Sequence, residues 1–276
     1  MSNWNIWHLA LNGYPGEPAR ALISSTRHEV LPKYSPDGQR IAFESNRSGY
    51  DEIWTSQADG SHLVQLTALK EWSGSPRWSP DGQQIAFDCN AAGNWDIYVI
   101  SSQGGRPRRL TTSGANEYRP SWSQDGKWIY YCSTRTGHQE IWKIPATGGT
   151  EERVTRHGGF VAFESVDGQD LYYTREQEGL WKKPVRGGDE NRVLASLLGN
   201  NFASAKRGVY FLEALPSSET TARLQFLDLT AQTVRTIAVV PGAVSDEISV
   251  SPDERWMLFN KNVREGSELM LIENFH

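Results

Sequence analysis

The chain has 276 residues, a formal net charge of −5 and a calculated isoelectric point near 5.7. A chain without net positive charge does not attract a phosphate backbone, which argues against DNA or RNA as a partner. No run of about 18 apolar residues is present to span a membrane, and residues 1–7 lack the charged and apolar regions of a signal peptide. The compartment therefore stays open between periplasm and cytoplasm.

A four-residue turn motif recurs about every 43 residues, except that the last two copies are two repeats apart, with a degenerate repeat around residues 208–211 between them. This spacing lies within the period of ~40–45 residues that is typical of propeller blades. The motif reads Ser-Pro-Asp-Gly from Ser35 to Gly38 and from Ser79 to Gly82. Proline presets φ, aspartate bonds its own backbone, and glycine supplies the positive φ that ends the turn. Altered copies follow at residues 123–126, 165–168 and 251–254. We interpret the repeated aspartates as turn-formers and not as metal ligands.

Each turn motif is followed by an apolar strand, such as Ile41–Phe43, and then by a strand with an aromatic end, such as Glu52–Trp54. β-Branched and aromatic residues suit strands that are covered on both faces, as stacked blades require. A turn glycine and a short final strand complete each repeat. The pattern predicts four strands per repeat.

In chain order, the predicted elements form one domain over residues 1–276. Residues 3–24 supply a third and a fourth strand, and residues 246–275 supply a first, a second and a third. Five complete blades lie between them, at residues 29–67, 73–111, 117–155, 160–195 and 202–238.

The fold class is therefore all-β, a β-propeller of six four-stranded blades whose ring is closed by N-terminal strands joining the C-terminal blade. Two strands then compete for one third-strand position. A seven-bladed ring with one incomplete blade is the alternative.

Two local features carry separate expectations. Glu254 stands where the other turns have glycine, and a left-handed backbone there would cost on the order of 1 kcal/mol. Cys89 and Cys132 occupy the same strand of adjacent repeats. We expect free, partly buried thiols, because equivalent positions on neighbouring blades lie too far apart for a disulfide.

The segments from Tyr34 to Thr67 and from Trp78 to Thr111 combine the turn motif, an Ile-Ala-Phe strand, an Ile-aromatic strand and a final Leu-Thr. This combination resembles the TolB-like, WD-repeat-like propeller family of bacteria, over most of the chain but less between about 190 and 245. In that family such repeats occur in periplasmic TolB, in peptidase propellers and in C-terminal sensor-like modules of bacterial regulators. The ending at residues 267–275 is similar to the last group, which implies the sensor domain of a larger regulator. A propeller hosts many activities, so the resemblance implies fold more strongly than function.

No catalytic centre is predicted. The sequence has no Gly-x-Ser-x-Gly elbow, no glycine-rich phosphate loop and no close histidine pair for a metal. We expect no enzyme activity, metal or cofactor. The alternative is the propeller of an enzyme, either one that gates a peptidase or a lyase-like one with a metal in its channel.

The loops that join the fourth strand of one blade to the first strand of the next do not share a motif, and they cluster on one face around the channel. They place aromatic residues beside charges, a mixture that is enriched where proteins bind partners. We predict that this face binds a protein, a peptide or a small ligand. Trp72, Tyr118 and Arg119 are the expected anchors, and Glu71, Glu117, Asp246 and Glu247 the expected acidic rim. The remaining candidates are His28, Glu29, His157, Asn200 and Asn201. The alternative is that Trp72 and Tyr118 only plug the channel.

Overall fold

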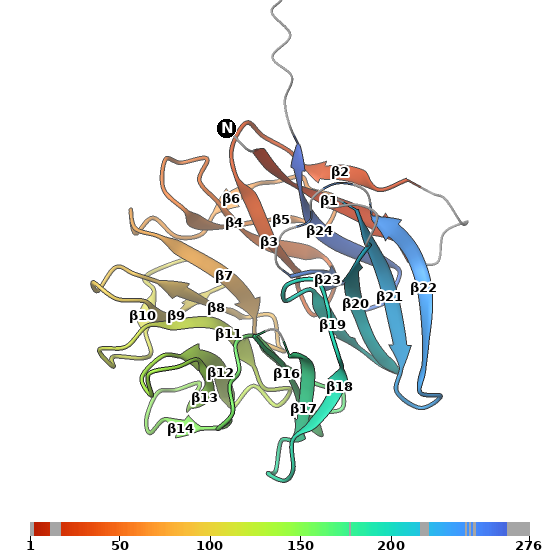
Figure 1. The fold of residues 1–276 in the computed structure, drawn as a ribbon. Helices are drawn as coiled ribbons and strands as arrows, with labels where there is room; N and C mark the ends of the chain where they lie inside the picture. Colours follow the sequence, from red (N-terminus) through yellow and green to blue (C-terminus); the bar gives the residue numbers. More distant parts are fainter. Residues whose placement is uncertain are drawn as a thin grey trace, which may run out of the picture.

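The computed structural model describes residues 3–11, 18–176, 178–215, 221–240, 242, 244 and 247–263. Within these ranges, 24 strands form six four-stranded antiparallel sheets, which surround one axis as a six-bladed β-propeller (Figure 1). The predicted fold class and the number of six blades are therefore confirmed. Among the described residues there is no helix capable of crossing a membrane.

The first five blades follow the chain without interruption. The first consists of β3 (Glu29–Tyr34), β4 (Arg40–Ser45), β5 (Glu52–Gln57) and β6 (Val64–Gln65). The second consists of β7 (Ser73–Trp78), β8 (Gln84–Cys89), β9 (Asp96–Ser101) and β10 (Arg108–Arg109). The third consists of β11 (Glu117–Trp122), β12 (Trp128–Ser133), β13 (Glu140–Pro145) and β14 (Glu152–Arg153).

The fourth blade consists of β15 (Ala162–Glu164), β16 (Asp170–Arg175), β17 (Gly179–Pro184) and β18 (Asn191–Leu194). The fifth consists of β19 (Phe202–Ala205), β20 (Gly208–Ala214), β21 (Ala222–Asp228) and β22 (Thr233–Val240). The first strands of successive blades contact one another, from β3 through β7, β11, β15 and β19 to β23 (Ser249–Val250) of the sixth blade and back to β3. They therefore surround the central channel.

The sixth blade joins the two ends of the chain. Its sheet order is β2 (Arg20–Ile23), β1 (Asn3–Ala10), β24 (Trp256–Val263) and β23 (Ser249–Val250). The whole of β1 pairs antiparallel with β24, so the N-terminal strand holds the third position and closes the ring as predicted (Figure 1). The rival third strand at residues 267–275 lies outside the described residues.

The repeat packs one large side chain per blade between the sheets. It belongs to the second strand and is almost fully buried in every blade, at Phe43, Phe87, Tyr131, Tyr173, Phe211 and Phe259. Cys89 and Cys132 follow two and one residues later, and both are free and buried. Because each blade buries its faces only against its two neighbours, the ring has to close for the first and last blades to be covered.

The turn motif is held by its own side chains. In the first copy, the Ser35 hydroxyl donates to Asp37 Oδ1 at 2.5 Å, and Asp37 Oδ1 accepts from the backbone N–H of Gln39 at 3.0 Å. The copies at residues 79, 123, 165 and 251 have the same serine–aspartate bond. Glu254 does adopt the left-handed conformation, with φ 55°, and its Oε1 accepts from the backbone N–H of Lys206 at 2.9 Å. That bond offsets part of the conformational cost.

Ile6 on β1 tests the ring closure. Its side chain is fully buried against Ile23, Ile41 and Leu258, which join the sixth blade to the first. We expect Ile6→Ala to lower the free energy of unfolding by about 2–5 kcal/mol, because the cavity cannot collapse between two sheets. The matched control is Val234→Ala on β22, where the side chain is 50% exposed and the expected change is within about 0.5 kcal/mol. If Ile6→Ala and Val234→Ala lower the free energy of unfolding in urea by equally small amounts, the placement of β1 is wrong.

Candidate functional site

In four of the six blades, the backbone at or just before the start of the first strand has the same unusual left-handed conformation. A non-glycine residue takes a left-handed φ at the equivalent position of the first, second, third and sixth blades, at Leu31 (54°), Ser75 (51°), Arg119 (55°) and Glu247 (66°). In the first three, the strand register shifts at this residue, as it does at a β-bulge. Such conformations cost of order 1–3 kcal/mol each and cluster at functional sites, and bulges re-aim side chains. The strained positions mark one end of the channel.

One carboxylate in the channel binds three cations. Glu247 precedes β23 and its side chain is fully buried. Lys33 Nζ of β3 lies 3.0 Å from Glu247 Oε2, and Arg119 Nη1 of β11 lies 2.8 Å from Glu247 Oε1. Arg77 Nη2 of β7 donates to the same carboxylate. Glu247 therefore joins the closing blade to the first, second and third blades; we call these four residues the channel network.

The channel network shifts the pKa of its members in opposite directions. Burial alone would raise the pKa of Glu247, but Arg77, Lys33 and Arg119 together hold it far below its usual range. Burial, with the repulsion of Arg77, lowers the pKa of Lys33 to about 7 despite the attraction of Glu247. The carboxylate stays ionised at neutral pH, whereas Lys33 is close to losing its proton.

Beside the channel network, the loop face is hollowed by a cavity of about 410 Å³, which we call the loop-face cavity. Three aromatic rings form part of its wall. Trp72 lies 6.1 Å from Trp95 between ring centroids, Trp95 lies 5.7 Å from Tyr118, and Trp72 is 54% exposed. The complete lining is Leu31, Glu44, Trp72, Gly74, Ser75, Asp88, Trp95, Tyr118, Arg119, Gln139 and Phe160. Leu31, Ser75 and Arg119 are three of the left-handed residues, so the strained backbone shapes this cavity.

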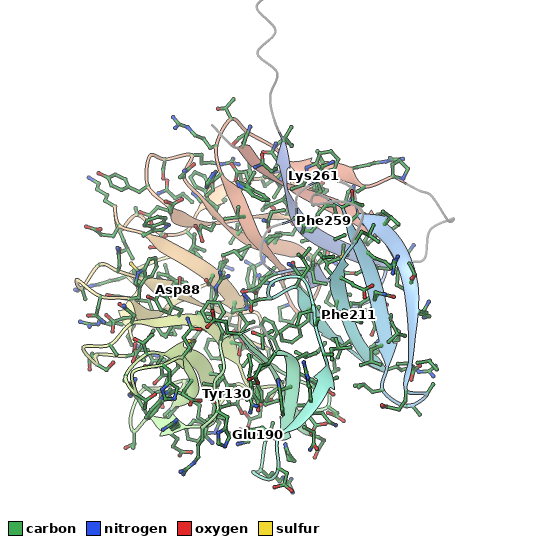
Figure 2. The ribbon with its side chains drawn as sticks, in the orientation of Figure 1. Asp88, Tyr130, Glu190, Phe211, Phe259 and Lys261 are labelled. Atoms are coloured by element: carbon green, nitrogen blue, oxygen red, sulfur yellow. The ribbon has the colours of Figure 1, made fainter. Side chains whose placement is uncertain are left out.

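Two carboxyl groups lie side by side in the loop-face cavity. Glu44 and Asp88 occupy equivalent positions on β4 and β8, and Figure 2 shows Asp88 on the second blade, across the ring from Phe211 of the fifth. Gly74 separates them: a Cβ atom at this position would collide with Glu44 Oε2 and lie 3.3 Å from Asp88 Oδ1. Glycine at residue 74 therefore makes room for the two acids.

Neither acid forms an ion pair with a described residue, although Arg119 attracts both carboxylates and Arg77 attracts that of Asp88. Burial and the neighbouring Asp88 raise the pKa of Glu44 to about 8, and burial also raises the pKa of Asp88. The Trp72 indole donates to Glu44, and the backbone N–H of Arg119 donates to Asp88 Oδ2 at 2.8 Å. Within the described part of the chain, no lysine or arginine forms an ion pair with Glu44. The Arg119 guanidinium binds Glu247 instead.

The structure brings the three predicted anchors together. Trp72, Tyr118 and Arg119 all line the loop-face cavity. Arg119 also belongs to the channel network, a role that the loop sequence did not indicate.

The expected acidic rim is different from the observed one. Glu117 and Glu247 are fully buried, because Arg135 binds Glu117 and the channel network binds Glu247, so neither forms part of an exposed rim. Glu71 is exposed but does not line the loop-face cavity. Asp246 lies outside the described residues. The acids that do line the cavity are Glu44 and Asp88.

The other candidates lie elsewhere. Glu29 is fully buried and pairs with Arg47 at 2.7 Å, in the same way as Glu117 pairs with Arg135. Asn201 is buried and donates to the backbone of Leu198. The last three candidates are partly or fully exposed and do not line the loop-face cavity: His28, His157 and Asn200.

Sequence reasoning missed Glu44, Asp88 and Trp95. A signal for the two acids exists, because they directly follow the buried phenylalanine of their second strands. The other blades have an uncharged residue at that position, at Cys132, Thr174, Leu212 and Asn260. A charge at an otherwise uncharged strand position, found twice in succession, indicates a special environment.

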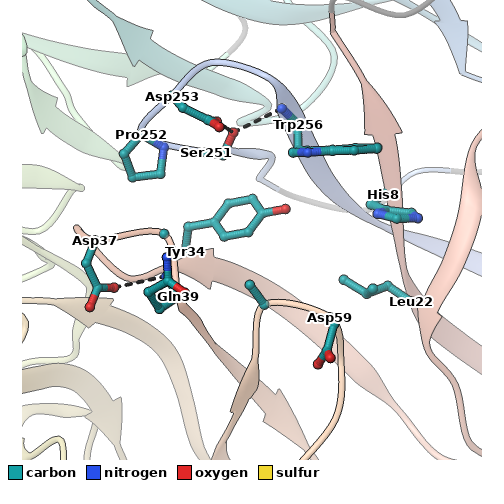
Figure 3. Close-up of a pocket in the computed structure, with 12 residues that line it drawn as sticks. His8, Leu22, Tyr34, Asp37, Gln39, Asp59, Ser251, Pro252, Asp253 and Trp256 are labelled. Carbon is teal, nitrogen blue, oxygen red and sulfur yellow. Dashed lines mark hydrogen bonds between the residues drawn. The ribbon is translucent and has the colours of Figure 1, made fainter.

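A second cavity of about 580 Å³ lies on the opposite face, at the seam between the sixth and first blades (Figure 3). Asp37, Asp59 and Asp253 line this seam cavity together with the stacked rings of His8 and Trp256. Serine hydroxyls of the local turns lower the pKa of all three aspartates. These acids already have hydrogen-bond donors from their own turns, unlike Glu44.

No three histidine, cysteine, aspartate or glutamate side chains in the described ranges are grouped so as to hold a metal ion. The thiols of Cys89 and Cys132 have raised pKa values because both are buried, so they are poor nucleophiles.

Glu247→Gln tests the channel network. The substitution leaves Lys33, Arg77 and Arg119 buried without their shared carboxylate, so we expect the free energy of unfolding to fall by about 3–5 kcal/mol. Glu213→Gln is the control, since Glu213 pairs with Arg223 at 3.1 Å with both side chains well exposed, and exposed pairs contribute ~0–1 kcal/mol. Similar midpoints for the two variants in urea unfolding would contradict a shared role of Glu247.

Three solved structures resemble the chain. TolB from Acinetobacter baumannii matches 96% of this chain with a TM-score of 0.66 and 19% identity, and the chain spans 64% of that protein. An oligogalacturonate lyase from Vibrio parahaemolyticus matches 91% of this chain and 76% of its own length, with a TM-score of 0.60 and 10% identity. A puromycin-hydrolyzing peptidase from Mycobacterium tuberculosis matches 86% of this chain and 45% of its own length, with a TM-score of 0.57 and 14% identity. At these identities the likeness shows the fold alone.

Comparison with curated proteins finds no match. The family model described as the TolB beta propeller domain matches residues 2–180, which is more than half of the chain and includes every described residue of the loop-face cavity. The chain belongs to the TolB β-propeller domain family.

Proposed function

We propose that the chain is a non-catalytic binding module that holds a protein or peptide partner at the loop-face cavity. The observation that carries this proposal is the wall of Trp72, Trp95 and Tyr118 around a cavity of about 410 Å³. Ligand sites are clefts of about 300–1,000 Å³ with many apolar and aromatic residues and a few polar ones. Tryptophan and tyrosine are also enriched among the residues that dominate binding energy.

The surrounding structure supports a preformed site. The left-handed residues at 31, 75 and 119 fix the inner wall, and the channel network fixes Arg119 through Glu247. A wall that is already ordered loses little conformational entropy when a partner binds, which favours affinity. As the sensor domain of a larger regulator, such a module would couple the presence of its partner to the rest of that chain.

The chemistry of the cavity favours binding over catalysis. A nucleophile needs a lowered pKa or an adjacent base, and the cysteines of this chain have raised pKa values. The acids Glu44 and Asp88 are instead arranged beside aromatic rings, where they can contact a bound group.

Selection of peptides from a random display library on the immobilised chain tests the proposal. We expect Trp72→Ala and Tyr118→Ala each to lower the affinity for the selected peptides by about 30-fold, since a central aromatic residue contributes about 2 kcal/mol or more to binding. Trp72 is 54% exposed, so its variant should keep the melting temperature of the parent.

The control is Tyr50→Ala. Tyr50 is 50% exposed in the turn between β4 and β5 and does not line the loop-face cavity, so we expect less than about a twofold change. The proposal is wrong if no peptide is selected, or if the peptides bind all three variants as they bind the parent.

A further inference from the structure

The geometry of the loop-face cavity points to the chemistry of its ligand. We propose that the cavity accepts a cationic side chain of the partner, the guanidinium of an arginine or the ammonium of a lysine, between the Trp72–Trp95–Tyr118 wall and the carboxyl groups of Glu44 and Asp88. This inference rests on the proposed function and adds the class of group that is bound.

The first argument is charge. Two carboxyl groups meet across Gly74, on adjacent blades, with hydrogen bonds from Trp72 and from the Arg119 backbone but with no ion pair to Glu44 within the described residues. Ionising both acids in this partly buried cavity is unfavourable, so the pair keeps a proton near neutral pH unless a cation binds there. The guanidinium of Arg119, which lines the same cavity, binds Glu247 and attracts both acids, but this attraction does not prevent the rise in the pKa of Glu44. A ligand can supply the missing positive charge.

The second argument is the wall. Trp72, Trp95 and Tyr118 are tilted toward one another by about 50°, with neighbouring centroids about 6 Å apart. Several aromatic faces around one cavity attract an organic cation, most strongly where tryptophan takes part. A small metal ion makes no use of such a wall, whereas a planar guanidinium both stacks on rings and bonds carboxylates in pairs.

The seam cavity shows that acids alone do not make such a site. It contains three aspartates, but their own turns donate hydrogen bonds to them and lower the pKa of each. In the loop-face cavity the pKa of both acids is raised instead. A cation therefore gains more in the loop-face cavity, where it also favours the ionisation of two acids that burial opposes.

The pH dependence of binding follows from Glu44. The groups that face it are Asp88 on β8, Asp51 in the β4–β5 turn, Arg119 on β11 and the Trp72 indole, with His28 beside Asp51. A cation favours the ionised carboxylate, and the pKa of Glu44 in the free protein is about 8. Affinity should therefore increase as the pH rises from about 6 to 9, and binding at pH 7 should release a proton.

Titration of the ¹⁵N-labelled full chain, followed at the indole signals of Trp72 and Trp95, tests the inference. The probe is Nα-acetylarginine amide, and the matched probe is Nα-acetylcitrulline amide, in which a neutral urea replaces the guanidinium. We expect the citrulline compound to bind at least about tenfold more weakly than the arginine compound. Equal affinities, or no shift with the arginine compound up to its solubility limit, would overturn the inference. So would calcium chloride that shifts these signals when the arginine compound does not.

Glu44→Gln and Asp88→Asn should each lower the affinity for the arginine compound by about tenfold. Glu44→Gln should also abolish the increase of this affinity with pH. Glu71→Gln is the control, because Glu71 is an exposed acid of the same loop as Trp72 that does not line the cavity. An equal loss in Glu71→Gln would indicate a diffuse negative field and contradict a built site.

The display peptides separate this inference from the proposed function. If peptides without arginine or lysine are selected, bind through Trp72 and are unaffected by Glu44→Gln, the loop-face cavity is a binding site and only its cationic ligand is wrong. If no peptide is selected and the arginine compound does not bind, both proposals fail.

Discussion

The ion pairs of Glu247 are the interaction on which the arrangement of the channel depends. A single carboxylate from the closing blade binds Lys33, Arg77 and Arg119 from three consecutive blades. Each partner is nearly buried, so removing the carboxylate would leave charges that water cannot reach. Blades of a propeller mainly contact their neighbours, whereas Glu247 connects the sixth blade to the second and third across the channel. It therefore fixes the position of the first strands relative to one another.

The loop-face cavity follows from the same contact. Arg119 has a left-handed backbone, its guanidinium binds Glu247, and its backbone N–H binds Asp88. The guanidinium of Arg119 is thereby held by Glu247, and its attraction for Glu44 and Asp88 does not offset the effect of their burial. The cavity combines a strained, ordered wall with two acids whose pKa values are raised by burial. This combination is the basis on which we propose that the cavity binds a partner.

The fold was predictable because the repeat is local. Each serine–aspartate turn is complete within about six residues, and each blade contributes one buried aromatic at a fixed offset, so the sequence alone indicates the blade number and the ring closure. The fate of individual acids was not predictable in the same way. Glu71, Glu117 and Glu247 look alike in the loops, yet Glu247 is buried by cations 128 to 214 residues away in the sequence. Trp72, Tyr118 and Arg119 could be found from loop composition, whereas Glu44 and Asp88 lie in strands and required the geometry of neighbouring blades.

The central physical claim is that Glu44 lacks a cation close enough to keep it ionised at neutral pH, and the side-chain carboxyl carbon of Glu44 reports this directly. A ¹³C NMR titration of the free chain, assigned with Glu44→Gln, would measure the pKa of this group. We expect the signal to titrate near pH 8, because burial and Asp88 both oppose ionisation. A pKa near the ordinary glutamate value of about 4.3 would show that Glu44 already has a compensating partner, and would contradict the description of the loop-face cavity as a site that lacks a cation.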